Sequence, residues 1–492
     1  MKAIITSACI AGLLAFTGCK KTLDTDAIGL TTIDQVNAVP TLNTVESSVR
    51  SSYQLMSNRL NILGQWDWGG GLVFHNDFVL QDIASDDVEK KWSPDGDQPW
   101  MDEVNNFTFT STNGGPNGLW KYNYEGIKRI NLAIQLLTKP DIEAITGITP
   151  ARKNQLLGEA YFIRSHYYFS LITNFGDVPL ILKPVQTYQE AFEVAVRAPA
   201  AQIWDTIKAN LATAKTLLPN TKYSSTTEKW RVSKGAVIAM QAKAALYTKK
   251  WADVLTFVTE LETLGFYHLN ANYFSSFNTE FTDDEVIFAY DHRSQEQPAN
   301  GNGICAPLGW GFLAPSTDFL NAFEANDPRK LYTVNTALQN VNKLLGSIDG
   351  TNKGNDDAPN NRIYIRYADV LLWKAEAYLE TQQYPQAIAA INLVRARART
   401  SVSATGTVPP AGTLPDRPAS TDPATIKNWL IAERRVELGF EEQRMADLKR
   451  WGIAKQVMTA QGKNFQDRHY LYPIPQSEID ASAGTLTQNS GY

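Results

Sequence analysis

The chain of 492 residues is poor in cysteine and histidine, with 3 Cys and 5 His, and it has no excess of positive charge. Its 46 Lys and Arg residues face 51 Asp and Glu residues, so the formal net charge is −5. Without dense basic clusters to neutralise phosphates, a nucleic-acid partner is excluded. The 43% hydrophobic and 20% charged residues are typical of a globular protein and exclude disorder over the whole chain.

Long hydrophobic runs are also lacking, because no stretch after the N-terminus reaches the eighteen apolar residues that a membrane-spanning helix needs. At the N-terminus itself, Lys2 precedes a run of fourteen apolar or small residues, 3–16. That length is too short to span a bilayer and is typical of the core of a signal peptide.

Thr17-Gly18-Cys19 follows this run and resembles a bacterial lipobox. We therefore expect residues 1–18 to be a lipoprotein signal peptide and Cys19 to carry the lipid that anchors the protein to a membrane. A plain secretory signal with an incidental Cys19 is the alternative. With Cys9 removed and Cys19 acylated, Cys305 stands alone, so the mature chain has no intramolecular disulfide.

Apolar residues recur at helical spacing through much of the chain, which predicts a mainly α fold with little strand. The predicted helices cover residues 119–137, 154–175, 201–218, 234–248, 253–264, 366–381, 385–399 and 426–451.

One pair of these helices has the spacing of a tetratricopeptide repeat. Ala375, Tyr378 and Ala387 match its small, aromatic and small positions, and Ile391 and Val394 fall at later packing positions. A weaker copy runs from Ala244 and Tyr247 through Trp251 to Val254. Because such hairpins must stack to bury their faces, we predict an α-α superhelix of helical-hairpin repeats.

Long irregular segments interrupt the helices. Residues 93–118 and 291–315 are rich in Gly, Asn and Pro, whereas residues 345–361 and 400–423 are polar or rich in Pro. Loops of this length in a compact protein are usually functional or disordered.

No catalytic or metal motif is present. The sequence contains no H-E-x-x-H, G-x-S-x-G or Walker A pattern, and no two of its histidines share a metal-ligand spacing. Glu433 and Glu437 form a carboxylate pair, but neighbouring arginines would hold them ionised, and an ionised carboxylate cannot act as a general acid. We expect no enzyme activity, no metal and no cofactor.

Four stretches resemble the SusD/RagB family of outer-membrane nutrient-binding lipoproteins, and they occur in the order found in that family. They are Gly158-Glu159-Ala160 to Phe175-Gly176-Asp177-Val178-Pro179; Arg366-Tyr367-Ala368-Asp369 to Ala375-Glu376-Ala377; Glu433-Arg434-Arg435-Val436-Glu437-Leu438 to Arg450-Trp451-Gly452; and Tyr472-Pro473-Ile474-Pro475 to Gln488-Asn489-Ser490-Gly491-Tyr492.

Several charges of these stretches lie within apolar helices, where a charge is tolerated only if it is paired and hydrogen-bonded. We expect such pairing for Arg164, Arg366, Glu376, Glu433, Arg435, Glu437, Arg444 and Asp447.

The resemblance implies one SusD-like fold over residues 19–492, with ligand-binding insertions around 61–118, 265–362 and 400–425. It also implies a function: a lipid-anchored protein on the surface of a Gram-negative outer membrane that captures glycan and delivers it to a SusC-like TonB-dependent barrel. A peptide ligand is the alternative within the family, and a glycoside hydrolase using two carboxylates is a further alternative outside it.

The ligand site is expected in loops that carry tryptophan beside short polar side chains, because sugar rings stack on indoles while their hydroxyls bond to Asp and Asn. The candidates are Trp66, Trp68, Trp92, Asp95, Asp97, Trp100, Asn302 and Trp310. For each tryptophan, packing inside the protein is the alternative, because Trp is amphipathic and commonly half-buried.

Overall fold

A computed structural model describes residues 39–57, 59–91, 97–278, 283–292, 312–337, 339–345, 360–402 and 406–492. Several predictions lie outside these residues. They are the signal peptide 1–18, the lipid attachment at Cys19, and the site candidates Trp92, Asp95, Asn302 and Trp310.

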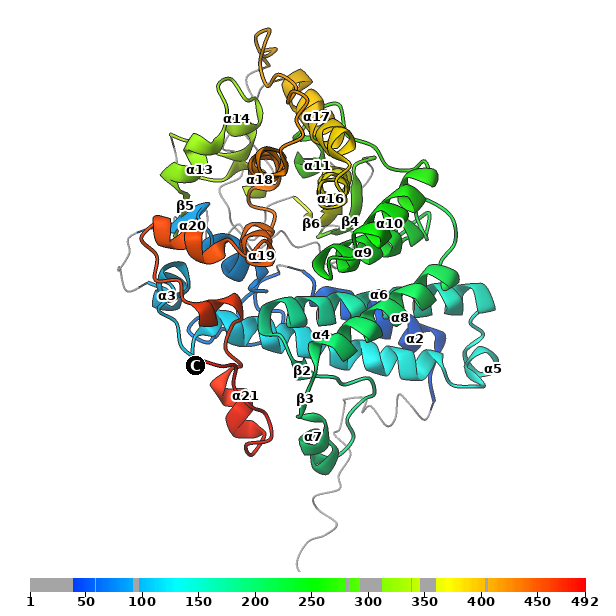
Figure 1. The fold of residues 1–492 in the computed structure, drawn as a ribbon. Coiled ribbons are helices and arrows are strands. Elements are labelled where there is room, and N and C mark those ends of the chain that lie inside the picture. Colours follow the sequence, from blue (N-terminus) through cyan, green and yellow to red (C-terminus); the bar gives the residue numbers. More distant parts are fainter. Residues whose placement is uncertain are drawn as a thin grey trace, which may run out of the picture.

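Long helices stack in chain order and form the scaffold (Figure 1). α2 packs on α4, α4 on α6, α6 on α8, α8 on α9, α9 on α10, α10 on α16, and α16 on both α17 and α18. Their bounds are α2 Leu42–Gln54, α4 Gly114–Leu137, α6 Pro150–Phe175, α8 Ala200–Leu217, α9 Lys234–Tyr247, α10 Trp251–Thr263, α16 Tyr367–Glu380, α17 Tyr384–Thr400 and α18 Pro423–Leu438.

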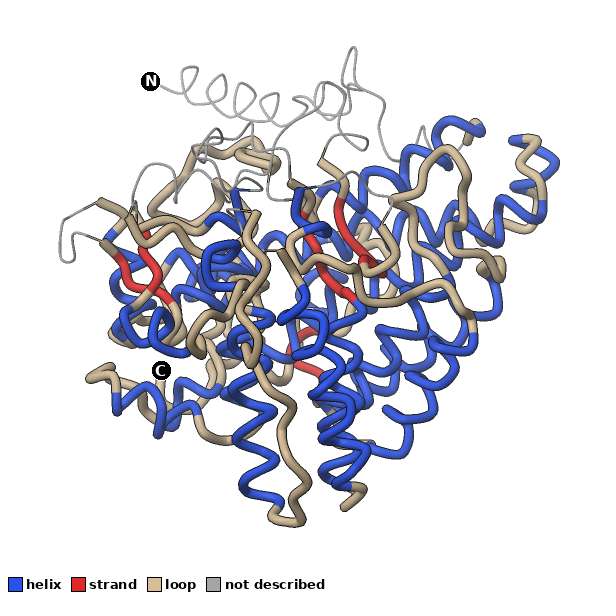
Figure 2. The backbone as a smooth tube through the Cα atoms, turned by 90° about the horizontal axis from the view of Figure 1, so that it is seen from above, coloured by secondary structure: helices blue, strands red, loops and turns tan. Residues whose placement is uncertain are grey.

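Shorter elements surround this stack, and in Figure 2 helix clearly dominates over strand. The short helices are α3 Pro99–Asn106, α5 Ile142–Thr146, α7 Tyr188–Val194, α11 Ser275–Asn278, α13 Thr317–Ala322, α14 Arg329–Thr333, α15 Asn342–Leu345, α19 Arg444–Arg450, α20 Ala454–Ala460 and α21 Gln476–Ala481, with a π-helix η1 Val79–Ile83 and a 3-10 helix η2 Asp467–Tyr470.

The strands pair two by two and antiparallel. β1 Val88–Lys90 pairs with β5 Leu313–Pro315, β2 Val178–Pro179 with β3 Arg197–Ala198, and β4 Val286–Tyr290 with β6 Arg362–Arg366. The predicted mainly α fold with little strand is confirmed.

Local signals explain where the long helices begin and end. In α6, the Thr149 hydroxyl accepts a hydrogen bond from the Arg152 amide, and Pro150 occupies the first helical position. The helix ends at Gly176, whose φ of 74° suits glycine. The predicted helix over 154–175 is therefore correct at its C-terminus and one turn short at its N-terminus.

The predicted tetratricopeptide hairpin is formed by α16 and α17. Ala375 and Ala387 are buried and allow the two helices to approach closely, and Ile391 and Val394 are buried in the same cluster. Tyr378 is half-buried against that cluster. The weaker copy is formed by α9 and α10, where Ala244 and Val254 are buried.

Two predictions of local structure were wrong. The segment 93–118 was expected as a loop, but it contains α3 and the first turn of α4. The single helix expected over 426–451 is broken into α18 and α19 at Gly439, which has φ −52° and ψ 133°. A Cβ atom at Gly439 would lie 2.5 Å from the Phe319 ring, so the close packing of α13 at this break requires glycine.

Buried ion pairs join the elements to one another. Glu437 of α18 accepts hydrogen bonds from Arg366 Nη1 at 2.7 Å and Arg329 Nη1 at 2.9 Å, and also from Arg397. Burial raises the pKa of Glu437, but Arg397, Arg366 and Arg329 together lower it far below its ordinary value. The carboxylate stays ionised, as expected, and its role is structural.

The other charges expected to pair do so with one exception. The pairs are Glu376 with Arg450, Glu433 with Arg395, Arg435 with Asp87, Arg444 with Asp86, and Asp447 with Arg434. The exception is Arg164, which donates to the amide oxygens of Asn131 and Asn210 and, among the described residues, has no carboxylate partner.

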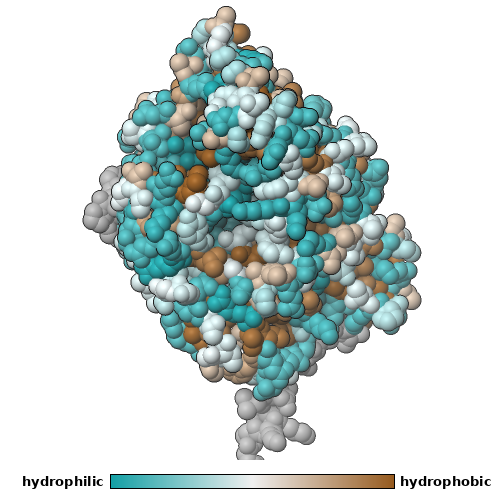
Figure 3. Space-filling model, viewed as in Figure 1, coloured by the Kyte–Doolittle hydropathy of each residue, from teal (hydrophilic) through white to brown (hydrophobic). Residues whose placement is uncertain are grey.

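The face of the molecule seen in Figure 3 is mostly hydrophilic, with hydrophobic residues scattered over it. No helix among the described residues has the length and apolar character needed to cross a membrane.

We predict that Glu437→Ala lowers the free energy of unfolding by ~3–5 kcal/mol, because it leaves three buried guanidinium groups without a shared partner. Urea unfolding measures this change. The matched control is Asp205→Ala, which breaks an exposed i,i+3 pair with Lys208 and should cost at most about 0.5 kcal/mol. Equal effects of the two substitutions would contradict the structural role of Glu437.

The contribution of Glu376 should depend on pH. Burial raises the pKa of Glu376, but Arg450 and Lys427 outweigh it and lower the pKa from 4.5 to about 2. A carboxyl with a depressed pKa in the folded state stabilises the protein above its unfolded pKa and loses that contribution as the pH falls. The stability difference between the wild type and Glu376→Gln should therefore be constant above pH 4.5 and shrink between pH 4.5 and about 2. Thermal melts across this pH range measure the stability difference. A difference that stays constant would contradict the lowered pKa of Glu376.

Candidate functional site

The turn that leads into α3 places two of the candidate residues side by side. Gln98 has a left-handed backbone with φ 53°, and Pro99 occupies the first turn of the helix. The Gln98 side-chain oxygen accepts a hydrogen bond from Trp100 Nε1 at 2.9 Å. In this turn Asp97 is exposed, whereas the Trp100 indole is buried and held by Gln98.

A glycine-rich loop brings a third candidate to the same place. The loop around Gly71 touches the N-terminus of α4 so closely that a Cβ atom on Gly71 would lie 1.9 Å from the Gly114 carbonyl oxygen. The Asn76 side chain stabilises this contact by donating hydrogen bonds to the Gly71 carbonyl at 3.0 Å and to the Gly114 carbonyl at 3.2 Å. Trp68, in the same loop, is thereby held near the N-terminus of α4.

Between α3 and α4, starting from the left-handed Phe107 with φ 57°, buried and exposed side chains alternate. Phe107 and Phe109 are buried, whereas Thr108 and Thr110 are exposed. Thr112 follows, with its hydroxyl 2.9 Å from that of Thr110.

Asn113 connects these segments. Its side-chain oxygen accepts from the Gly115 amide at 2.8 Å and caps α4, while its side-chain nitrogen donates to the Trp100 carbonyl at 2.9 Å and to Glu103 Oε2 at 2.8 Å. One amide group thus fixes the start of α4 relative to α3.

Together these segments enclose an open hollow of about 450 Å³, a size suited to a small ligand. It lies by α3, at the side of the molecule opposite α10 (Figure 1). The lining residues are Trp68, Gly69, Asp97, Gln98, Pro99, Trp100, Glu103, Thr108, Thr110, Thr112, Asn113 and Gly114.

The described tryptophans differ in what they offer a ligand. Trp68 is half-buried, with its ring edge-on to Phe74 at 5.9 Å between centroids. Trp100 is only 6% exposed, so it presents little of its ring and no open stacking face. Trp66 is 63% exposed but is not among the residues that line the hollow. Trp68 is thus the described tryptophan that lines the hollow with a partly exposed ring.

The structure therefore brings together Trp68, Asp97 and Trp100, three of the predicted site residues. Sequence reasoning missed Glu103, Asn113 and the three threonines. The alternation Phe107-Thr108-Phe109-Thr110 was the available signal, since it is the pattern of an extended segment with one buried face.

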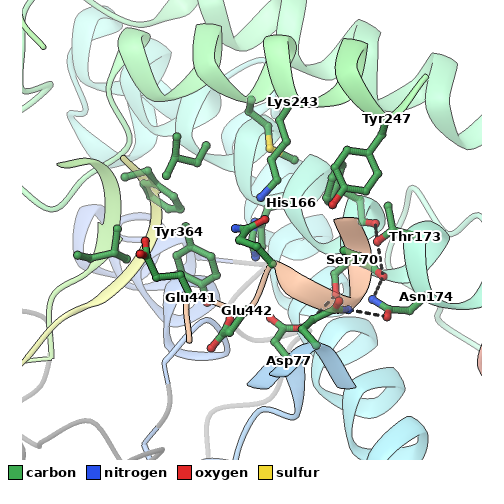
Figure 4. Close-up of a pocket in the computed structure, with 18 of the residues that line it drawn as sticks. Asp77, His166, Ser170, Thr173, Asn174, Lys243, Tyr247, Tyr364, Glu441 and Glu442 are labelled. Atoms are coloured by element: carbon green, nitrogen blue, oxygen red, sulfur yellow. Dashed lines mark hydrogen bonds between the residues drawn. The ribbon is translucent and has the colours of Figure 1, made fainter. Parts of the chain in front are cut away.

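A second cavity lies inside the protein, where α6, α9, β6 and the segment after α18 meet (Figure 4). Lys243 of α9 and His166 of α6 point toward one another there, with Asp77, Glu441 and Glu442 below them. Burial lowers the pKa of His166 to about 3, so its imidazole is neutral near pH 7. At about 70 Å³ the cavity has room for several waters but not for a sugar chain.

A third hollow of about 660 Å³ lies between α4 and residues 181–186. Its lining is largely apolar, including Ile127, Leu132 and Val185, and Tyr124 supplies its one aromatic ring among the described residues. It lacks carboxylates among those residues and offers fewer partners for sugar hydroxyls than the hollow beside α3.

No group of three or more metal-ligating side chains is gathered anywhere in the described part of the chain.

The fold and the hollow beside α3 define a helical-repeat protein that presents a ligand-sized site in the loops outside its repeats. Two family sequence models match the chain: "SusD family" over residues 326–492 and "Starch-binding associating with outer membrane" over residues 45–246. The chain belongs to the SusD/RagB family.

Individual relatives agree with this membership. SusD-like protein P2 of Formosa agariphila is 27% identical over 444 residues, which cover 79% of this chain and 83% of that protein. A solved structure described as a laminarin binding SusD-like protein superposes with a TM-score of 0.73 at 24% identity, covering 92% of this chain and all of the other. Surface glycan-binding protein A from Bacteroides fluxus has a TM-score of 0.72 at 22% identity, with the same coverage. At such identities the two structures establish the shared fold.

We predict that Asn113→Ala destabilises the protein by about 1–2 kcal/mol, the usual effect of losing an N-cap side chain. Asn113→Asp keeps the capping oxygen but loses the amide donor to Glu103 and Trp100. If Asn113 holds α3 against α4, Asn113→Asp should also be destabilising. Thermal melts of both variants check this. If Asn113→Asp is as stable as the wild type, Asn113 stabilises the protein through its capping oxygen alone.

Proposed function

We propose that this protein is a lipid-anchored, glycan-binding protein of the outer-membrane surface, which captures oligosaccharide or polysaccharide and delivers it to a TonB-dependent transporter. The glycan occupies the hollow beside α3. The protein binds and releases its ligand without cleaving it.

One observation carries the proposal: the hollow combines an apolar ring with many hydrogen-bonding groups. The Trp68 indole suits the C–H face of a pyranose. Around it stand the carboxylates of Asp97 and Glu103 and the hydroxyls of Thr108, Thr110 and Thr112. Carboxylates accept hydrogen bonds from sugar hydroxyls, and threonine hydroxyls both donate and accept them.

The size of the stacking surface favours weak, reversible binding. If one sugar face covers about 40 Å² of the half-buried Trp68 ring, its burial contributes roughly 1 kcal/mol at ~25 cal/mol per Å². Hydrogen bonds add to this, and immobilising the ligand subtracts from it. The balance corresponds to dissociation constants of roughly millimolar to micromolar, suited to capture and release.

The relatives support a carbohydrate ligand. Two of the structural neighbours are described as laminarin binding and as a surface glycan-binding protein, and one matching family description names starch binding and the outer membrane. These descriptions concern binding proteins, which supports a site without catalysis.

The anchor and the transporter partner rest on the sequence. The lipobox-like Thr17-Gly18-Cys19 supports attachment through Cys19, and membership of the family supports a SusC-like barrel as the receiving partner. Under this proposal, the helical repeats provide the rigid body that holds the hollow.

The test is affinity gel electrophoresis of the purified mature protein through a panel of embedded polysaccharides. For a polysaccharide that retards the wild type, Trp68→Ala should weaken binding roughly fivefold, since it removes about 1 kcal/mol of stacking. Tyr188→Ala is the control, because Tyr188 is 90% exposed on α7 and distant in sequence from the hollow. Circular dichroism establishes that both variants are folded.

Undiminished binding by Trp68→Ala would remove this hollow from the site. Retention by immobilised peptides and by no polysaccharide would favour the peptide alternative. New reducing ends after incubation with a retained polysaccharide would show cleavage and contradict the non-catalytic proposal.

A further inference from the structure

The hollow beside α3 carries charge of one sign. Asp97 and Glu103 contribute two carboxylates to its lining, and none of its described lining residues is Lys, Arg or His. The remaining polar groups are neutral amides and hydroxyls.

Lys90 and Lys91, the described lysines of the same segment, are not among the residues that line the hollow. The side chain of Lys90 is buried, and its Nζ donates to the Asp97 backbone carbonyl at 2.9 Å and lies 3.6 Å from Asp102 Oδ2. It also lies over the Phe312 ring, 5.6 Å from the ring centre. The ammonium group therefore stabilises the turn before α3 from inside the protein, through the Asp97 carbonyl. Lys90 is not among the residues that line the hollow.

Glu103 is held in place. Its Oε2 accepts a hydrogen bond from Asn113, whose side chain is itself fixed by the Gly115 amide and the Trp100 carbonyl. A carboxylate positioned by such a network cannot swing far from an approaching anion, so any repulsion acts at a defined distance.

We propose that this hollow selects neutral glycans and rejects those that carry carboxylate or sulfate groups. The inference rests on the proposed function and names the class of its ligand. Neutral sugars present only hydroxyls, which donate to both carboxylates. A uronate or sulfate brings a second anion beside Asp97 or Glu103, none of the described lining residues is a cation that could pair with it, and the two like charges repel.

The test compares chemically matched ligands. A neutral polysaccharide that the protein retains is compared with its carboxymethylated derivative, which has the same backbone and added carboxylates. Isothermal titration calorimetry at low salt should show binding of the derivative weakened by roughly tenfold or more. Raising the salt to about 1 M shortens the screening length to ~3 Å. The difference in affinity between the neutral polysaccharide and its carboxymethylated derivative should then become smaller.

Variants then assign the effect to the hollow. Glu103→Gln and Asp97→Asn each remove one negative charge with little change of shape, so the ratio of the two affinities should move toward one, whatever happens to each affinity alone. Glu193→Gln removes the same charge from exposed α7, outside the hollow, and should leave the ratio at its wild-type value. Equal binding of the two ligands by the wild type, or a ratio unchanged in Glu103→Gln and Asp97→Asn, would overturn the inference.

A panel of natural polysaccharides separates this inference from the proposed function. Retention by neutral glucans, xylans or mannans, and not by alginate, polygalacturonate or carrageenan, supports both. Retention by the anionic polymers alone overturns the selectivity and leaves glycan binding intact. Retention by none of them contradicts the proposed function, and the inference with it.

Discussion

The structure depends on the charge cluster around Glu437. Burying a carboxylate and several guanidinium groups carries a large desolvation cost, which is recovered only when all of them meet with good geometry. Arg329, Arg366 and Arg397 come from α14, β6 and α17, and they meet at one carboxylate on α18. These elements hold one another in place, because displacing any of them would break a buried ion pair with Glu437. The cluster thus ties the irregular segments to the stacked helices.

The candidate site depends on close approach of the backbone rather than on charge. Gly71 and Gly114 allow two segments to touch, and Asn76 donates hydrogen bonds to both. Asn113 joins α3 to the start of α4, so the segments that line the hollow, with Trp68 among their residues, are held relative to one another. A weak ligand benefits from such a preformed surface, because little conformational freedom is lost when it binds.

Much of the scaffold could be predicted because it obeys local rules. The helical spacing of apolar residues located the long helices, and the small residues Ala375 and Ala387 identified the hairpin of α16 and α17. The break at Gly439 and the helix α3 escaped prediction, because the first is set by contact with Phe319, far away in the chain, and the second lies in a segment whose Gly, Asn and Pro content favours loops. Within the candidate site, Trp68, Asp97 and Trp100 could be found from composition and the threonines from the alternation of Phe and Thr, whereas no sequence signal pointed to Glu103.

The sequence by itself determined the fold class, the family and the need for the charges in its apolar helices to find partners, because periodicity, motif order and desolvation act locally along the chain. Only the tertiary structure decided which tryptophan of the candidate site keeps its ring partly exposed and which is buried, since exposure depends on what packs around a side chain. It also decided that two carboxylates share a hollow without a lining cation among the described residues. Relations between segments distant in the chain arise from packing, and no local pattern encodes them.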